Sequence, residues 1–447
     1  MAQLDKLTLA RASSVGLQRS FSSLKPYLQR SRWVGNNNQY RTDTIASLER
    51  DTDPGGTLVH RQLAQYIAAS APLHCADGWS LLGRALGCHA QGDCDSARHF
   101  AYYAELRAAL SLLAAEGIGV FDKRHFVVEN VRNCVRVRNG FGTHTMARAA
   151  LEDWANLPRA ASLIGGNLLT IGGKPFSDWL SQFLSGASFG PIGNHWLRTW
   201  GLDLRLMVED QNARNESSYR PTRLNQRKLL DASNSSDFIC SLWSLFEPSG
   251  QSVFENLDRH LVRLMLEEAF KGVTGRTPAA ARARFRKRIA NMLSQLMSDD
   301  GQRKRWLDFL TRQVEPRDPI IVTESKKQTA ITDPRNHLQV ISRAALLLRV
   351  ATGASSGLIR EAQLSSSNLK FWWEALGKER GLWDTNGEPT ELNNLWADIE
   401  ASLSRIRQWE TENAGGNFSL ARWRTERARE VSVLAECERI AVWGLQP

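Results

Sequence analysis

The chain has no long uninterrupted apolar segment. A helix needs about 20 consecutive apolar residues to cross a bilayer, and the apolar run Ala344–Leu348 is closed by Arg349. We therefore expect no contact with a membrane. Acidic residues are missing from residues 6–42, which contain arginine, lysine and serine. An organellar transit peptide has such a composition, but the pattern continues into ordinary folded-looking sequence, which favours a basic N-terminal helical segment.

Cysteines are few, six in all, and none forms a CxxC pair. This usage predicts a reducing, cytoplasmic location without a disulfide framework. Residues 74–75 and 88–89 pair histidine with cysteine, and Cys94 and His99 follow, which raises the question of a zinc site. Adjacent ligands do not match the spacing of structural zinc sites. Buried cysteines and helical histidines are the better interpretation, and we expect no metal and no cofactor.

Three motifs of nucleotide and peptide chemistry are also missing. Gly172-Gly173-Lys174 lacks the upstream glycine spacing and the following serine or threonine of a phosphate-binding loop. The chain contains no HExxH sequence and no dinucleotide-binding GxGxxG after a predicted strand. Nucleotide hydrolysis and redox catalysis are therefore not expected.

What the sequence does contain is helical periodicity. Residues 60–70 place apolar groups at helical spacing, and Pro72 should end that helix. Further helices are expected after Asp77 and from residue 96 to the glycine at 117. Residues 118–137 are rich in valine and partly alternating, which predicts a short hairpin. The expected fold class is mainly α, multi-helix, with a minor β segment near 118–138.

The length of the chain, 447 residues, suggests several segments rather than one. Single cores rarely exceed roughly 250–300 residues. Prolines at 316, 319 and 334 surround Ile320–Thr323, which we expect to be extended, and this region is the best boundary. The expected segments are 1–76, a basic N-terminal helical segment; 77–160, a helical domain; 161–315, a central basic helical region; and 316–447, a C-terminal helical domain.

The net charge of +10 comes mainly from arginine, since only 12 of the 57 basic residues are lysines. The planar fork of arginine suits phosphates and carboxylates, and a basic surface gives affinity for nucleic acid. A GC-rich genome would also favour arginine over lysine everywhere. The charge therefore indicates a polyanionic partner without identifying it.

The stretch from Arg138 to His144 is the best candidate for chemistry. Asn139 follows the arginine, glycines at 140 and 142 permit a tight loop, and His144 opens a predicted helix. Arginine can hold a phosphate while histidine exchanges protons near neutral pH. The spacing alone is common in an arginine-rich chain, so the loop and the helix carry the hypothesis. The alternative is a solvated arginine at a strand end and an ordinary histidine at a helix start.

Together with the helix that precedes it, this stretch resembles the HEPN superfamily of α-helical ribonucleases. Their motif is an arginine, usually followed by a polar residue, and a histidine four to six residues later. The resemblance covers about residues 77–157, and the valine-rich stretch 118–137 departs from the plain helix of the family. It implies a homodimer in which two motifs build one RNA-cleaving site, and a role in toxin or antiviral defence systems. Arg138, Asn139 and His144 would be the catalytic residues.

Clusters of basic residues could collect RNA along helix faces. Arg284 and Arg288 share a face if their stretch is helical. The alternative is a solvated face that pairs with acids elsewhere. Phe371, Trp372 and Trp373 could stack on bases, but their helical spacing favours core packing. The expected nucleic-acid-binding residues are Arg220, Arg223, Arg227, Arg282, Arg284, Arg286, Lys287, Arg288, Arg303, Lys304 and Arg305.

Two functions therefore stand side by side. The first is a metal-independent, HEPN-like RNA-cleaving effector, with RNA as substrate and a second copy as partner. The second is a non-catalytic helical subunit that binds nucleic acid or proteins in a multi-component assembly such as a defence complex.

Overall fold

The structure is a computed structural model that describes residues 3–138, 140–184, 206–219, 232–248, 253–383, 389, 393–413 and 419–447. Most of these residues lie in helices, and the described strands form one three-stranded and one two-stranded antiparallel sheet. The expected mainly α fold with a minor β segment near 118–138 is confirmed. No helix in the described part of the chain is long and apolar enough to cross a bilayer.

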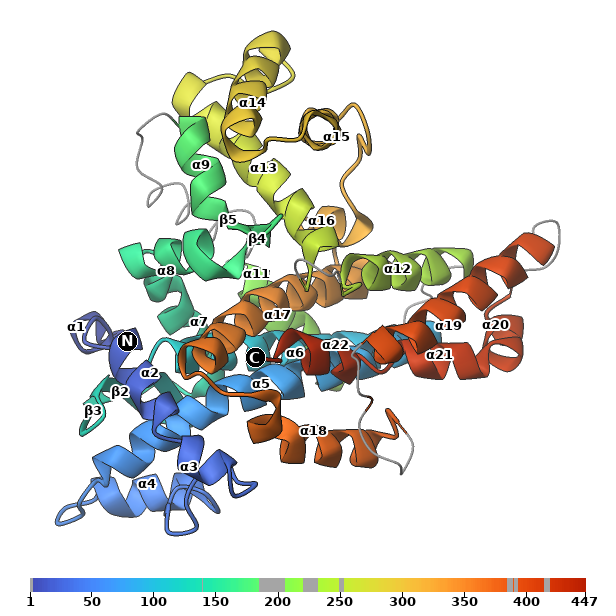
Figure 1. The fold of residues 1–447 in the computed structure, drawn as a ribbon. Helices are drawn as coiled ribbons and strands as arrows, with labels where there is room; N and C mark the ends of the chain where they lie inside the picture. Colours follow the sequence, from blue (N-terminus) through green and yellow to red (C-terminus); the bar gives the residue numbers. More distant parts are fainter. Residues whose placement is uncertain are drawn as a thin grey trace.

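Three long helices lie at the centre of the molecule (Figure 1): α5 (His60–Ala90), α6 (Cys94–Ala115) and α17 (Asn336–Glu361). α5 and α6 form a hairpin. Gly92 turns the chain with φ 77°, and the Asp93 side chain caps α6 by accepting a hydrogen bond from the Ser96 amide. α17 packs against both helices.

Helix α17 is buried over most of its length, because every residue from 336 to 352 is buried. A helix that is buried on all sides must also satisfy its polar groups. Arg343 Nε donates to Asp210 Oδ2 at 2.6 Å, which ties α17 to α11 (Leu206–Tyr219). Arg349 Nη2 lies 2.7 Å from Asp258 Oδ2, which ties α17 to α13 (Glu255–Thr274).

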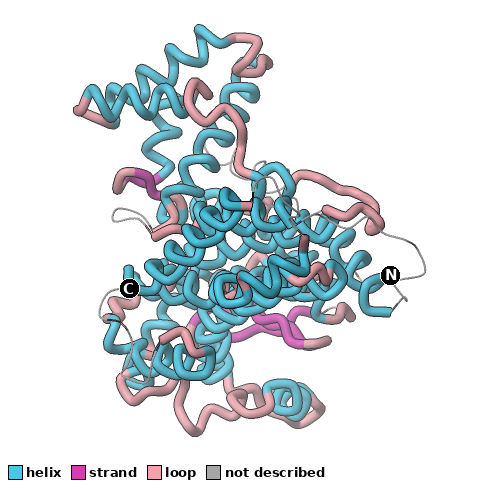
Figure 2. Tube along the Cα trace, turned by 90° about the vertical axis from the view of Figure 1, so that its right-hand side faces the viewer, coloured by secondary structure: helices cyan, strands magenta, loops and turns pink. Residues whose placement is uncertain are grey.

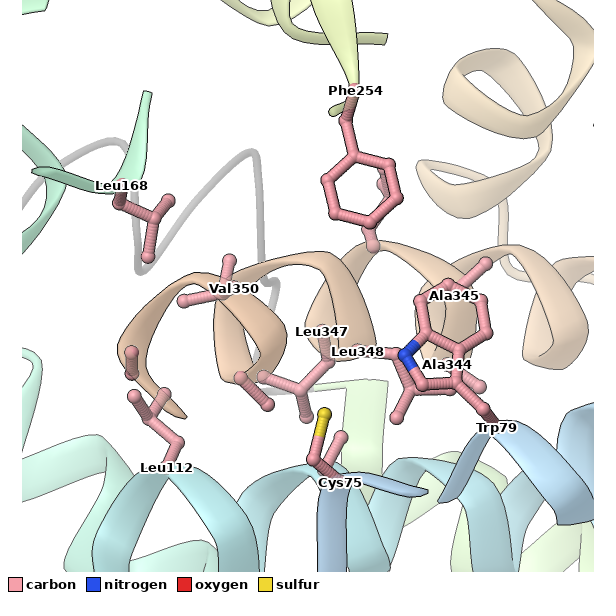
Figure 3. Packing of buried hydrophobic residues seen from close by; sticks show 14 of the residues in the cluster. Cys75, Trp79, Leu112, Leu168, Phe254, Ala344, Ala345, Leu347, Leu348 and Val350 are labelled. Atoms are coloured by element: carbon pink, nitrogen blue, oxygen red, sulfur yellow. The ribbon is translucent and has the colours of Figure 1, made fainter. Parts of the chain in front are cut away.

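Figure 3 shows the packing between α17 and the α5–α6 hairpin. Trp79 and Cys75 of α5 both face Thr352, which accepts a hydrogen bond of 2.9 Å from the Trp79 indole. A Cβ atom at Gly78 would lie only 2.6 Å from Leu348 Cδ2. Glycine at position 78 therefore allows α5 and α17 to approach closely.

The structure corrects the helix break expected at Pro72. Pro72 does not end a helix: it lies buried inside α5, which runs unbroken to Ala90. Proline removes one backbone hydrogen bond, and the burial of apolar side chains along both halves of this helix offsets the loss. Helix α17 likewise runs unbroken through Gly353. Gly353 fits there because Leu168 lies so close that a Cβ would be 2.9 Å from it.

The expected extended run at Ile320–Thr323 is also corrected, because these residues begin the helix α16 (Ile320–Ser325). Their β-branched side chains favour strands locally. Here Ile321 and Val322 are buried, and α16 packs on α17, so tertiary packing overrides the local preference. Pro319 suits the start of a helix, where its missing amide costs nothing.

The minor sheet follows α6 and contains one strand more than the expected hairpin. Its strands are β1 (Ile118–Phe121), β2 (Arg124–Asn130) and β3 (Asn133–Val137), paired antiparallel in that order. Ile118 pairs with Val127, and Val127 with Val135. The sheet lies below the central helices in Figure 2 and leads into α7 (Thr143–Trp154), which packs on α6.

The remaining helices surround this centre (Figure 1). N-terminal to it lie α1 (Lys6–Leu9), α2 (Ser14–Ser22), α3 (Lys25–Leu28) and α4 (Thr44–Thr52). The upper part of the figure contains α8 (Pro158–Leu163), the π-helix η1 (Ile164–Leu168), β4 (Thr170–Ile171), β5 (Lys174–Pro175), α9 (Phe176–Leu184), α13, α14 (Arg282–Leu296) and α15 (Asp300–Leu310). The helices not yet named are α12 (Ala232–Leu245), in the middle of the chain, and the C-terminal helices α18 (Ser366–Arg380), α19 (Asn393–Glu412), α20 (Leu420–Glu426), α21 (Ala428–Leu434) and α22 (Glu438–Gly444).

The four expected segments share one continuous cluster of buried apolar side chains. The boundary expected at 76/77 falls inside α5, and the one at 160/161 falls inside α8. The boundary at 315/316 lies in the loop between α15 and α16. α17, from the last segment, packs against helices of the first two.

Truncation of Leu348 tests how much this packing stabilises the fold. Leu348 is fully buried against Gly78 of α5, so Leu348→Ala should lower the free energy of unfolding by about 2–5 kcal/mol. The same change at Leu7, which is 86% exposed, should cost about 0.5 kcal/mol or less. Urea unfolding followed by circular dichroism measures both. Equal losses in the two variants would contradict the central place given to α17.

Candidate active site

The residues of the expected motif lie at the end of β3 and the start of α7. Arg138 is exposed, and its backbone amide donates to Asp5 Oδ2 at 3.3 Å. Asn139 lies outside the described residues. His144 is in the first turn of α7, as the sequence predicts. Among the described residues, no hydrogen bond or ion pair joins Arg138 to His144.

His144 faces α6 instead. Its Nδ1 atom lies 2.6 Å from the Tyr102 hydroxyl oxygen. The two rings are stacked, with centroids 5.6 Å apart and an angle of 15° between their planes. The hydrogen bond with the Tyr102 hydroxyl thus holds the imidazole at Nδ1. The Nε2 atom takes no part in this hydrogen bond.

The arginine near His144 is Arg214, which comes from α11. Its guanidinium carbon lies 4.9 Å from the centroid of the Tyr103 ring and 5.8 Å from that of Tyr102. Its Nη2 also donates a hydrogen bond to the Tyr103 hydroxyl. This arrangement orients the guanidinium plane beside the two tyrosines, as cation–π contacts do.

A second histidine completes the group. His99 Nδ1 lies 2.9 Å from Ser218 Oγ of α11, and the His99 ring is 5.0 Å from the Tyr103 ring. The Tyr103 ring is also 6.1 Å from the ring of His144. We call His99, Tyr102, Tyr103, His144 and Arg214 the two-histidine cluster.

The electrostatics of the two-histidine cluster suit proton transfer. Burial, and secondly the positive charge of Arg214, lower the pKa of both His99 and His144 from the ordinary histidine value. Both side chains are therefore neutral near pH 7 and can accept a proton. Burial raises the pKa of Tyr102, so that its phenol stays protonated.

The expected basic residues divide into two groups. Arg220, Arg223 and Arg227 lie outside the described residues. The others lie on α14 and α15, in the upper part of Figure 1. Arg286 pairs with Asp308, and Arg303 with Asp300, while Arg288 is partly buried over the Phe183 ring. Exposed residues with no acidic partner within the described ranges are Arg282, Arg284, Lys287, Lys304 and Arg305; we call these five the basic patch.

Several other sequence features belong to the core. Trp372 and Trp373 are buried and stacked on each other. His89 is buried against His337, with Nδ1 and Nε2 2.9 Å apart. In the described part of the chain, no group of three or more His, Cys, Asp or Glu side chains is placed to hold a metal ion.

The spacing GxSxG of hydrolase nucleophiles occurs twice in the sequence, at 186–190 and 353–357. The first stretch lies outside the described residues. In the second, Ser355 is fully buried inside α17, 3.2 Å from Ser111 Oγ. A nucleophile of this kind needs an exposed strand-to-helix turn, so Ser355 has a packing role.

Sequence reasoning found His144 but missed its partners. His99 and Tyr103 are four residues apart in one helix, a spacing that places them on a common face, and this was the available signal. No local signal connects Arg214 with this face, because α11 reaches α6 only through tertiary packing.

Comparisons of the chain with models of known protein families, with curated proteins and with solved structures found no match.

The charge of Arg214 offers a direct test of the two-histidine cluster. Arg214→Gln should raise the pKa of both His99 and His144, because it removes the positive charge that opposes their protonation. Titration of the histidine ring protons by NMR measures this change. Arg138→Gln is the matched control and should leave the pKa of His144 unaltered. The reverse pattern would show that Arg138, not Arg214, lies beside His144.

Proposed function

We propose that the protein cleaves RNA without a metal ion, at the two-histidine cluster. One observation carries the proposal: two neutral histidines and an arginine surround the side chain of Tyr103. Cleavage within an RNA strand needs a base, an acid and a group that holds the phosphate. His99, His144 and Arg214 are of the required types.

The proposed reaction is an internal transfer of the phosphodiester. One histidine takes the proton of the ribose 2′-hydroxyl as its oxygen attacks phosphorus. The other histidine gives a proton to the 5′-oxygen as the bond from phosphorus to that oxygen breaks, so a 2′,3′-cyclic phosphate and a free 5′-hydroxyl result. Arg214 would hold the phosphate oxygens, and the Tyr102 hydroxyl would keep His144 in position. The second histidine starts neutral, so it acts as the acid only after taking up a proton. Because the pKa of both histidines is lowered, the rate should fall as the pH rises through a pKa below the ordinary histidine value.

The proposal changes one role that the sequence suggested. Arg138 was the expected phosphate ligand, and Arg214 takes that role here. All three side chains come from one chain, so this chemistry does not require a composite site between two copies. The HEPN resemblance would extend the proposal to a homodimeric effector in a toxin or antiviral defence system.

A second candidate function is non-catalytic binding of nucleic acid. The basic patch on α14 and α15 favours it, since exposed basic side chains without acidic partners attract phosphates. In Figure 1 this patch lies in the upper part of the molecule, away from α7. The patch could therefore bind RNA whether or not the two-histidine cluster cleaves it.

The cleavage proposal is tested with a labelled RNA in the presence of EDTA. Replacement of His99, His144 or Arg214 by alanine should each lower the cleavage rate about 10²-fold or more, because each removes a group that acts in the transition state. The same sequence as DNA should not be cleaved, since it lacks the 2′-hydroxyl.

Arg138→Ala is the control for that experiment and should cleave at close to the wild-type rate. Loss of activity in Arg138→Ala with retention in Arg214→Ala would assign the phosphate to Arg138 and overturn the proposed site. If the wild type cleaves no RNA while circular dichroism shows it folded, the second, non-catalytic function is the one that stands.

The basic patch is tested by the salt dependence of binding. With uncleavable 2′-O-methyl RNA, the double variant Arg284→Ala/Lys287→Ala should bind more weakly and lower the slope of log affinity against log salt by about 1.4, since single strands contribute about 0.7 for each phosphate contact. Fluorescence anisotropy at several salt concentrations measures the slope. Arg424→Ala/Arg429→Ala removes the same charge from exposed positions on α20 and α21. A similar effect of that control would mean that net charge, not the patch, sets the affinity.

A further inference from the structure

A cavity of about 540 Å³ lies beside α5 and α18. Its wall is formed by the loop that contains Arg32 and Trp33, by α5, by Arg107 of α6 and by Phe371 of α18. Cavities of roughly 300–1,000 Å³ are of the size that holds small organic ligands. The two-histidine cluster contributes no residue to this wall.

The wall carries more positive than negative charge. Arg32, Arg41 and Arg107 line it, and Asp77 is the acidic residue among the lining side chains. Asp77 lies 3.5 Å from Arg107, which leaves Arg32 and Arg41 without an acidic partner among the described residues. Both of these side chains are exposed at the edge of the cavity, where arginine forks can bind a phosphate in two-point contacts.

His74 makes the wall richer in hydrogen-bond donors. Arg107 Nη1 donates to His74 Nδ1 at 2.7 Å, so the neutral imidazole carries its proton on Nε2. Burial, and secondly the charge of Arg107, lower the pKa of His74 to about 3. The imidazole is therefore neutral at physiological pH and offers an N–H group rather than a charge.

Aromatic rings form the other part of the wall. Tyr66, Trp33 and Phe371 line the cavity. The rings of Trp33 and Phe371 meet edge to face, with centroids 6.3 Å apart, and Trp33 also packs on Trp372 at 4.9 Å. These contacts hold the rings in place before a ligand arrives, and such rings are suited to stack on a planar base.

We propose that this cavity binds a nucleoside monophosphate, with the base among Trp33, Tyr66 and Phe371 and the phosphate at Arg32 and Arg41. An anion alone would leave the aromatic wall unused, and a neutral aromatic molecule would leave the two arginines unused. The site is independent of the proposed cleavage, because the two share no residue.

Isothermal titration calorimetry of the full chain with AMP, GMP, CMP and UMP tests the proposal. At least one of the four should bind with one-to-one stoichiometry, and more tightly than either adenosine or inorganic phosphate. Failure of all four to bind overturns the proposal. Inorganic phosphate that binds as tightly as the nucleotides overturns it as well, because the aromatic wall would then have no role.

Variants locate the bound nucleotide. Arg32→Ala and Arg41→Ala should each weaken binding about tenfold, the usual effect of one lost charged hydrogen bond. Tyr66→Leu should weaken it while retaining an apolar side chain. Arg30→Ala is the matched control, since Arg30 is exposed and close in sequence but does not line the cavity; it should bind like the wild type.

His144→Ala separates this inference from the proposed function. It should lower the rate of RNA cleavage about 10²-fold or more and leave nucleotide binding unchanged. If it abolishes binding, or if Arg30→Ala weakens binding as much as Arg32→Ala, the nucleotide lies elsewhere and the cavity is not its site.

Discussion

The structure depends on the burial of one helix, α17, on all sides. Burial of Arg343 and Arg349 within that helix is tolerated only because each meets an aspartate, Asp210 of α11 and Asp258 of α13. A buried charge without a partner would be strongly destabilising. These two ion pairs therefore fix α11 and α13 against the centre of the molecule. The position of α11 has a functional consequence, because Arg214 lies one helical turn after Asp210.

Helix α6 connects the structural centre with both proposed sites. Along it, His99, Tyr102 and Tyr103 belong to the two-histidine cluster, and Arg107 belongs to the cavity wall. In both places an arginine lies close to a histidine whose pKa is lowered, by burial first and by the arginine second. Such histidines are neutral donors and acceptors rather than cations. The phosphate-binding charge in each proposed site is thus supplied by arginine, in agreement with a chain whose basic residues are mostly arginine.

The elements predicted from the sequence agree best with the structure where the prediction rests on residues that are close together in the chain. The helical repeat, the valine-rich segment before Arg138 and the start of α7 at Thr143 all follow from residues close together in the chain. Pro72 and Ile320–Thr323 were misread for one reason: their local preferences are weak compared with the burial of apolar surface in a packed helix. The Trp372–Trp373 pair was correctly expected in the core, because its spacing and its size both favour burial.

By itself the sequence determined the helical class of the fold, the location of the minor sheet, the basic balance of charge and the place of His144 at a helix start. Each of these depends on composition or on a repeat of a few residues. Only the tertiary structure decided which arginine lies beside His144, that His99 joins it, and that Arg32, His74 and Phe371 line one cavity. These residues come from different helices and, for Arg32, from a loop. Their contacts arise from how buried surfaces and ion pairs such as Arg343–Asp210 arrange the helices in space, which no short stretch of sequence specifies.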